Sequence, residues 1–267
     1  MIPEGRSPLN LTSKARIPAK SWGPSAPEEQ TVLIMDGHFL TGILDKSQFG
    51  ASAHGLVHAM YEVYGPPYAG KLLSILGRLF TSYLQFAGFT CRMDDLILTP
   101  KGDELRRDLI KSSETLGHQV AAEVTDLDAT KEDIYSIKSK ADIRDKLEDC
   151  LRDDEKMAHL DSCMKSKTNR ITSKIISTCI PDHLFKPFPQ NNMQVMTVSG
   201  AKGSSVNVSQ ISCLLGQQEL EGRRVPTMVS GKTLPSFQAY DTSARSGGFI
   251  TGRFLTGIKP QEYFYHW

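Results

Sequence analysis

A lysine stands in the middle of a glycine-containing break between two helical patterns, in the segment Ser199-Gly200-Ala201-Lys202-Gly203-Ser204. Glycines let the backbone come close to a ligand, and the helix that follows offers unpaired N–H groups and the positive end of its dipole. Lys202 could therefore contact a phosphate group. The spacing does not satisfy the Walker loop, and the alternative is a kink between helices whose lysine is solvated.

Two glutamines and two arginines lie close together in the segment Gln217-Gln218-Glu219-Leu220-Glu221-Gly222-Arg223-Arg224-Val225-Pro226. The pattern places them around the C-terminus of a predicted helix, where cations offset the helix dipole. That structural role is the simpler interpretation. The functional alternative is a polar wall that faces a nucleotide, a nucleic acid or a partner protein.

No other set of residues has the spacing of a catalytic or metal site. The seven histidines do not pair with acids or cysteines at ligand spacing, and the five cysteines include no C-x-x-C pair. The acidic clusters Asp94-Asp95 and Asp153-Asp154-Glu155 are explained by a strand start and by the solvated face of a helix. The residues alone therefore predict no catalytic group and no bound metal.

Composition excludes several classes of protein. Lysine plus arginine (31) nearly cancel aspartate plus glutamate (30), so no overall positive field indicates a nucleic-acid binder. The sequence has no secretory signal and no apolar run of the roughly 20 residues that span a bilayer. Widely spaced cysteines, odd in number, argue against a disulfide framework and favour a reducing compartment. We expect a soluble, intracellular α+β protein.

The elements that must position the candidate residues begin with a proline-rich segment. Residues 1–30 contain five prolines and are predicted to be extended. Thr31–Met35 is a β-prone run, and Asp36-Gly37 is typical of the turn of a hairpin into residues 39–44.

Two helices are predicted next, over residues 56–64 and 72–83, because their apolar residues recur at helical spacing. Gly65-Pro66-Pro67 separates them. Phe89–Leu98 is predicted as a further strand.

The second half is predicted to be mainly helical. Between His118 and Ile180 there is neither glycine nor proline, and apolar residues recur every three or four positions. This pattern predicts one long amphipathic helix over residues 141–178. Pro181 and the Pro187-Phe188-Pro189 segment then force a reversal of the chain.

A second helical arm follows the reversal. Asn191 is predicted to cap a helix through Val198, which resumes over residues 206–215 and ends at Gly216. The two arms would form an α-helical hairpin. Pro260 begins a further helix, and the chain stops seven residues later at Trp267 with aromatic residues exposed, so we expect a piece truncated at the start of that helix.

Two strings of residues resemble a known family. Residues 199–226, SGAKGSSVNVSQISCLLGQQELEGRRVP, resemble the funnel region of the largest subunit of multisubunit DNA-directed RNA polymerases. Residues 247–266, GGFITGRFLTGIKPQEYFYH, resemble the lead into that subunit's bridge helix. The sequences GRFLTGIKP and CLLGQQELEGRR are similar to the RNA polymerase I form of the subunit. Residues 42–65 resemble its pore domain.

The resemblance implies a division of the chain. Residues 1–30 would lead in from an upstream active-site domain, 31–115 would form the pore domain, and 116–245 would form the funnel domain with its helical hairpin. Residues 246–267 would begin the cleft and bridge-helix domain. Lys202 would lie close to the incoming triphosphate at the inner end of the channel. The polar surface of that channel would be lined by Asn207, Gln210, Gln217, Gln218, Arg223 and Arg224.

The resemblance also implies partners and a metal. The full enzyme would transcribe ribosomal RNA from a DNA template in the nucleolus of the nucleus, using nucleoside triphosphates and Mg²⁺. Other polymerase I subunits, the RNA product and a transcript-cleavage factor or domain at the funnel would be partners. The family's aspartate motif, similar to N-A-D-F-D-G-D, does not occur here, so the fragment alone is predicted to be inactive. The alternative is a stand-alone helical-hairpin module that binds polymerase partners without catalysis.

Overall fold

The structure is a computed structural model that describes residues 5–24, 26–125 and 137–267. The chain forms two compact units, and each is built from two separate segments of sequence. Unit 1 contains residues 1–95 and 186–205, and unit 2 contains residues 96–185 and 206–267. The mixture of helices and small sheets agrees with the predicted α+β class.

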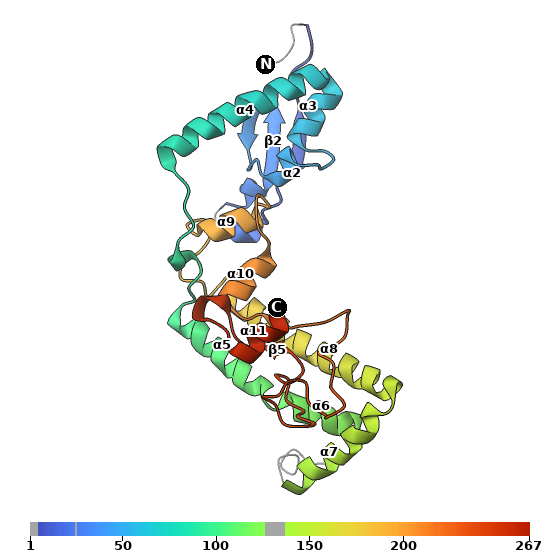
Figure 1. The fold of residues 1–267 in the computed structure, drawn as a ribbon. Coiled ribbons are helices and arrows are strands. Elements are labelled where there is room, and N and C mark those ends of the chain that lie inside the picture. The colour runs from blue at the N-terminus through green and yellow to red at the C-terminus, as the bar shows by residue number, and fades with distance from the viewer. Residues whose placement is uncertain (1–4, 25, 126–136) are drawn as a thin grey trace. The chain divides into compact units, whose positions relative to one another are not determined.

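Unit 1 begins with a three-stranded antiparallel sheet in the order β1-β2-β3 (Figure 1). The strands are β1 (Leu11–Lys14), β2 (Thr31–Met35) and β3 (His38–Thr41). The predicted hairpin is confirmed, and both turn residues, Asp36 and Gly37, have the positive φ that its tight turn requires. Two short helical turns, α1 (Ala19–Trp22) and η1 (Pro27–Gln30), interrupt the lead-in that we expected to be extended. Proline is compatible with them because Pro18 precedes α1 and Pro27 opens η1.

Three helices complete the first segment of unit 1: α2 (Lys46–Phe49), α3 (Leu56–Tyr64) and α4 (Pro66–Ala87). Leu56, Met60 and Tyr64 of α3 pack with Ile34 of β2 and Leu72 of α4 to form the core of this unit. Both predicted helices are confirmed, although α4 starts earlier than expected because Pro66 and Pro67 occupy its first turn. Only the first part of α4 is buried. Beyond it, the apolar residues Leu79, Tyr83 and Phe86 are exposed, the last one 97% exposed.

The predicted strand over residues 89–98 is wrong. The segment instead contains the turn η2 (Met93–Asp95), in which the carboxylate of Asp95 accepts a hydrogen bond from the N–H of Arg92. Asp95 is 1% exposed, and Asn191 donates to its backbone oxygen at 2.7 Å. Lys186 pairs with Asp94 at 2.5 Å, and this contact lowers the pKa of Asp94. These contacts bring the second segment of unit 1 against the first.

That second segment contains α9 (Asn192–Val198). The predicted cap is confirmed, because the side chain of Asn191 accepts a hydrogen bond from the N–H of Gln194 at 2.9 Å. The next helix, α10 (Ser205–Ser212), ends earlier than predicted, and Gly216 begins a strand instead of ending the helix. The predicted interruption of the second arm after Val198 is confirmed, and each of its two parts is a short helix.

Unit 2 is built around α8 (Asp154–Cys179), which packs against α5 (Pro100–Ser113), α6 (Leu116–Val124) and α7 (Ile137–Leu151) (Figure 1). The prediction of a single helix over residues 141–178 is wrong, because the structure has two helices there, α7 and α8. The chain breaks after α7, and the carboxylate of Asp153 caps α8 by accepting from the N–H groups of Glu155 and Lys156. Residues 126–136, which belong to the predicted funnel segment 116–245, lie outside the described residues.

The C-terminal segment folds onto this helical layer. Strand β4 (Gly216–Gln217) pairs with β5 (Phe249–Ile250), and η4 (Phe254–Thr256) and α11 (Pro260–His266) follow. Arg253 donates to the backbone oxygen of Ser212 and pairs with Asp103, both at 2.9 Å. Arg106 donates to the backbone oxygen of Thr251 at 2.9 Å. The two arginines therefore connect the C-terminal segment to α5 and α10. The helix predicted at Pro260 is confirmed.

Candidate functional site: a basic loop and a glutamine–arginine segment

The loop that carries Lys202 lies in unit 1, between α9 and α10. Gly200 and Gly203 have φ of 77° each, a region that favours glycine, so the loop depends on both residues. Lys202 is exposed, and none of the described residues forms an ion pair or a hydrogen bond with its side chain. Its ammonium group is therefore available to a ligand.

Two further basic residues contact this loop, Arg16 through its side chain and Lys46 through its backbone. A Cβ added at Gly200 would lie 2.9 Å from the side chain of Arg16, so Arg16 runs across the glycine. The N–H of Lys46 donates to the backbone oxygen of Ser199 at 3.4 Å. A groove of about 740 Å³ adjoins the loop and includes Lys46, Gly200 and Ala201 in its lining. Arg16, Lys46 and Lys202 together form what we call the basic loop.

Local folding explains why Arg16 and Lys46 come to this place. The buried carboxylate of Asp45 accepts hydrogen bonds from the N–H groups of Arg16 at 2.5 Å and Ile17 at 3.0 Å. The same side chain caps α2, which begins at Lys46, by accepting from the N–H of Ser47 at 2.9 Å. One buried acid therefore holds the backbones of both cationic residues. Sequence reasoning did not identify Arg16 or Lys46, because nothing in their local pattern indicates the contact.

The other candidate residues lie in unit 2, so the structure divides the predicted channel set between the units. Asn207 is exposed and Gln210 half-buried, three positions apart on α10, where side chains share a face. Arg223 is exposed at a tight turn in which Leu220 and Arg223 exchange backbone hydrogen bonds. Glu221 and Gly222 have positive φ at this turn.

The prediction that residues 217–226 surround a helix C-terminus is wrong. Gln217 lies in strand β4, and its side-chain amide donates to the backbone oxygens of Gly247 at 2.8 Å and Gln218 at 2.9 Å. The amide oxygen of Gln218 lies 3.1 Å from a ring nitrogen of His266. Gln217 therefore has a structural role between two strands, whereas Gln218 joins the segment to α11.

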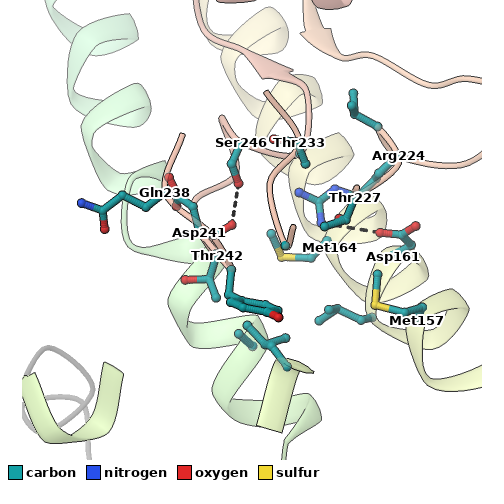
Figure 2. A pocket seen from close by; sticks show the side chains of 18 residues that line it. Met157, Asp161, Met164, Arg224, Thr227, Thr233, Gln238, Asp241, Thr242 and Ser246 are labelled. Atoms are coloured by element: carbon teal, nitrogen blue, oxygen red, sulfur yellow. Dashed lines mark hydrogen bonds and ion pairs between the residues drawn. The ribbon is translucent and has the colours of Figure 1, made fainter. Parts of the chain in front are cut away.

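Arg224 turns away from the surface into a pocket of unit 2 (Figure 2). It is 9% exposed, and its guanidinium lies 3.7 Å from the carboxylate of Asp161 on α8. Burial lowers the pKa of Arg224 and raises the pKa of Asp161. The opposite charge of each residue acts against the shift of the other. Sequence reasoning missed Asp161, because it is one of many charged residues on an amphipathic helix.

Neither set of residues has the composition of a metal centre. Among the residues that the structure describes, no three His, Cys, Asp or Glu side chains lie close enough to hold a metal ion. Over the same ranges, no helix combines the length and apolarity needed to cross a membrane. The chemistry available at the basic loop is electrostatic attraction of anions, and phosphate groups are the anions that such loops bind in proteins.

Two family models match most of the chain, and known proteins match nearly all of it. Residues 1–96 match the family model "RNA polymerase Rpb1, domain 3", and residues 129–250 match "RNA polymerase Rpb1, domain 4". The first match covers the first segment of unit 1 almost residue for residue.

Similar proteins come from distant organisms. The chain is 60% identical over 264 residues to DNA-directed RNA polymerase I subunit rpa1 of Schizosaccharomyces pombe, 99% of this chain and 15% of the relative. It is 54% identical over 258 residues to subunit RPA190 of Saccharomyces cerevisiae, 97% of the chain and 15% of the relative. It is 53% identical over 265 residues to rpa1 of Dictyostelium discoideum, 98% of the chain and 16% of the relative. The chain thus spans about 15% of the length of the curated relatives it matches.

Proposed function

The chain belongs to the Rpb1 family of RNA polymerase largest subunits, and from this membership we propose that it serves RNA polymerase I as the part through which nucleotides enter. The whole enzyme would transfer nucleotides from nucleoside triphosphates to a growing ribosomal RNA on a DNA template. Its place would be the nucleus, and within it the nucleolus. The observation that carries the proposal is the 60% identity to a polymerase I subunit across 99% of the chain.

The residues of this chain would act by position and charge. The basic loop would attract the triphosphate, because three basic residues from three segments of unit 1 raise the local concentration of an anion. Lys202 would make the contact, and Arg16 and Lys46 would add to the positive potential. Asn207, Gln210, Gln218 and Arg223 would line the polar surface of the channel. Gln217 and Arg224 would stabilise the segment that carries this surface, through their contacts inside unit 2.

The catalytic Mg²⁺ of the full enzyme would be held by residues outside this chain. Two-metal phosphoryl transfer requires carboxylate-bound ions, and no suitable cluster of side chains occurs in the described ranges. The aspartate motif of the family is absent from the sequence as well. The metal-dependent phosphoryl transfer would therefore take place at another part of the subunit. Other polymerase subunits, the nucleic acids and a transcript-cleavage factor or domain would be the partners.

A chimeric subunit tests the proposal. In Schizosaccharomyces pombe, the matching segment of rpa1 is replaced by this chain, and growth and ribosomal RNA synthesis are measured. We expect both to be supported, because 60% of the aligned residues are identical. The control strain receives its own segment through the same cloning. A chimeric subunit that assembles into polymerase and yet makes no ribosomal RNA would overturn the proposal.

The same chimera tests the role of Lys202. Changing Lys202→Ala should raise the KM for nucleoside triphosphates roughly fivefold, as expected for the loss of about 1 kcal/mol from an exposed charge contact. Lys202→Arg should retain most of the affinity. Lys71→Ala is the matched control, since Lys71 is an exposed lysine on α4 of the same unit. Equal effects of Lys202→Ala and Lys71→Ala would argue against a triphosphate contact.

A further inference from the structure

The pocket behind Arg224 lies wholly within unit 2, between α6, α7, α8 and the loop over residues 224–247 (Figure 2). One wall is apolar and includes Met157, Leu160 and Met164. Other parts of the lining are polar and include Arg224 and Thr227. The cavity of about 80 Å³ is roughly half the ~150 Å³ that holds a whole benzene. One edge of a single ring therefore fits, and the rest of the ring would remain outside.

The guanidinium of Arg224 has unsatisfied hydrogen-bond donors. Its Nε is buried without a partner, and no described residue accepts a hydrogen bond from the group. Its interaction with Asp161, at 3.7 Å, is too long for a hydrogen bond. A buried cation is costly when its N–H groups are not paired. An acceptor oxygen placed in the pocket would remove that cost.

Two of the neighbouring polar groups already have partners. The hydroxyl of Ser246 donates to the backbone oxygen of Asp241 at 2.6 Å, and Thr233 shares a hydrogen bond of 2.9 Å with Tyr265. The carboxylate of Asp161, in contrast, accepts no hydrogen bond from any described residue. Arg224 and Asp161 are therefore a charged pair that remains open to a ligand, Arg224 to an acceptor and Asp161 to a donor.

We propose that this pocket binds the edge of a small uncharged ring that carries a carbonyl and an N–H side by side, the edge of a lactam. The carbonyl accepts from Arg224, and the N–H donates to Asp161. The charges of these two residues cancel, so a charged ligand would bring an unbalanced charge into the pocket. Methionine thioethers on the apolar part of the lining make favourable contacts with flat aromatic rings.

The simplest probe is 2-pyridone, added to the 267-residue chain labelled with ¹³C at the methionine methyl groups. We expect saturable shifts of the Met157 and Met164 methyl signals, with a dissociation constant on the order of 1 mM for so small a compound. The signals of Met35 and Met93, which are exposed in unit 1, should not move. N-methyl-2-pyridone, which lacks the N–H, should bind at least about tenfold more weakly.

Two variants connect the binding to the two residues. Arg224→Lys keeps the charge and loses the planar fork, and it should weaken 2-pyridone binding about tenfold. Asp161→Asn should remove the preference for 2-pyridone over its N-methyl derivative. An unchanged far-ultraviolet circular dichroism spectrum of each free variant indicates an intact fold, and if Arg224→Lys does not fold, Asp161→Asn still decides the question.

Three results would overturn the inference: equal binding of the two compounds, shifts of all methionines without saturation, or unchanged binding by the folded variants. The inference uses unit 2 alone and does not depend on the polymerase proposal. Failure of the chimeric strain to grow would leave it intact, and failure of 2-pyridone to bind would leave the polymerase proposal intact.

Discussion

Gly247 has no side chain because the guanidinium of Arg224 occupies the space in which a Cβ would stand. Gly247→Ala should therefore displace Arg224 and lower the free energy of unfolding by roughly 2–3 kcal/mol, as overpacking does in a buried site. Urea unfolding of the chain measures the effect. Gly70→Ala on α4 is the control, since nothing lies within 4 Å of its added Cβ, and it should be neutral or slightly stabilising. Equal stability of the two variants would mean that Arg224 moves aside at no cost.

The hydroxyl of Tyr265 is a second residue-level constraint in unit 2. It donates to the backbone oxygen of Ser246 at 2.8 Å, and burial raises its pKa from the ordinary value of 10.0, while the hydrogen bond with Thr233 acts in the opposite direction. Above about pH 10 the unfolded chain loses this proton before the folded chain does, so the folded state binds more protons and stability falls as pH rises.

Tyr265→Phe removes this dependence on pH. Urea unfolding at pH 9 and pH 11 should show a larger loss of stability for the parent chain than for the variant. The two proteins differ only at this residue, so the difference between the two slopes isolates Tyr265. Parallel slopes would show that its pKa is not raised.

At the scale of elements, Asp153 decides where α8 begins. Its carboxylate accepts hydrogen bonds from Glu155 at 3.0 Å and Lys156 at 3.4 Å. Asp153→Ala should lower the free energy of unfolding by about 1 kcal/mol, the usual effect of losing an N-cap. Asp153→Asn retains an acceptor oxygen and should lose only a few tenths of that. If the asparagine variant were as unstable as the alanine variant, charge near the helix dipole would matter more than the cap.

Elements with strong local chemistry could be predicted from the sequence. The Asp36-Gly37 turn, the helix over residues 56–64 and the Asn191 cap each depend on residues that are neighbours in the chain. The strand predicted over residues 89–98 was wrong because distant residues determine that segment: Asn192 donates to the backbone oxygen of Thr90 at 2.7 Å. Tertiary contacts of this kind leave no local pattern.

The candidate sites follow the same rule. The glycine pattern identified the loop of Lys202, since positive φ at Gly200 and Gly203 is a local property. Arg16 reaches that loop only through the fold, and the pairing of Asp161 with Arg224 joins distant parts of unit 2. The Asp153 cap could have been found, because an aspartate followed by two acids is typical of a helix start.

At the scale of the whole molecule, the chain exposes a large apolar face on α4. Leu79, Tyr83 and Phe86 recur at helical spacing and are all exposed. Apolar patches of this kind promote association in solution. The chain should therefore self-associate with rising concentration, as measured by sedimentation velocity.

A variant with all three residues changed to serine should stay monomeric over the same concentrations. A control with three polar exposed residues of α4 changed, Ser74→Ala, Arg78→Ala and Gln85→Ala, should associate as the parent does. A parent chain that is monomeric throughout would contradict the prediction.

The division of each unit into two sequence segments also affects the order of events on the ribosome. Unit 1 cannot be completed when Asp95 emerges, because Lys186 and Asn191, which contact Asp94 and Asp95, are synthesised only after residues 96–185. At roughly 5–20 residues per second this delay is on the order of ten seconds. During that time the sheet and helices of unit 1 lack the contacts of residues 186–205. A nascent chain is therefore incompletely folded for an interval that a refolding experiment on the finished chain would not reveal.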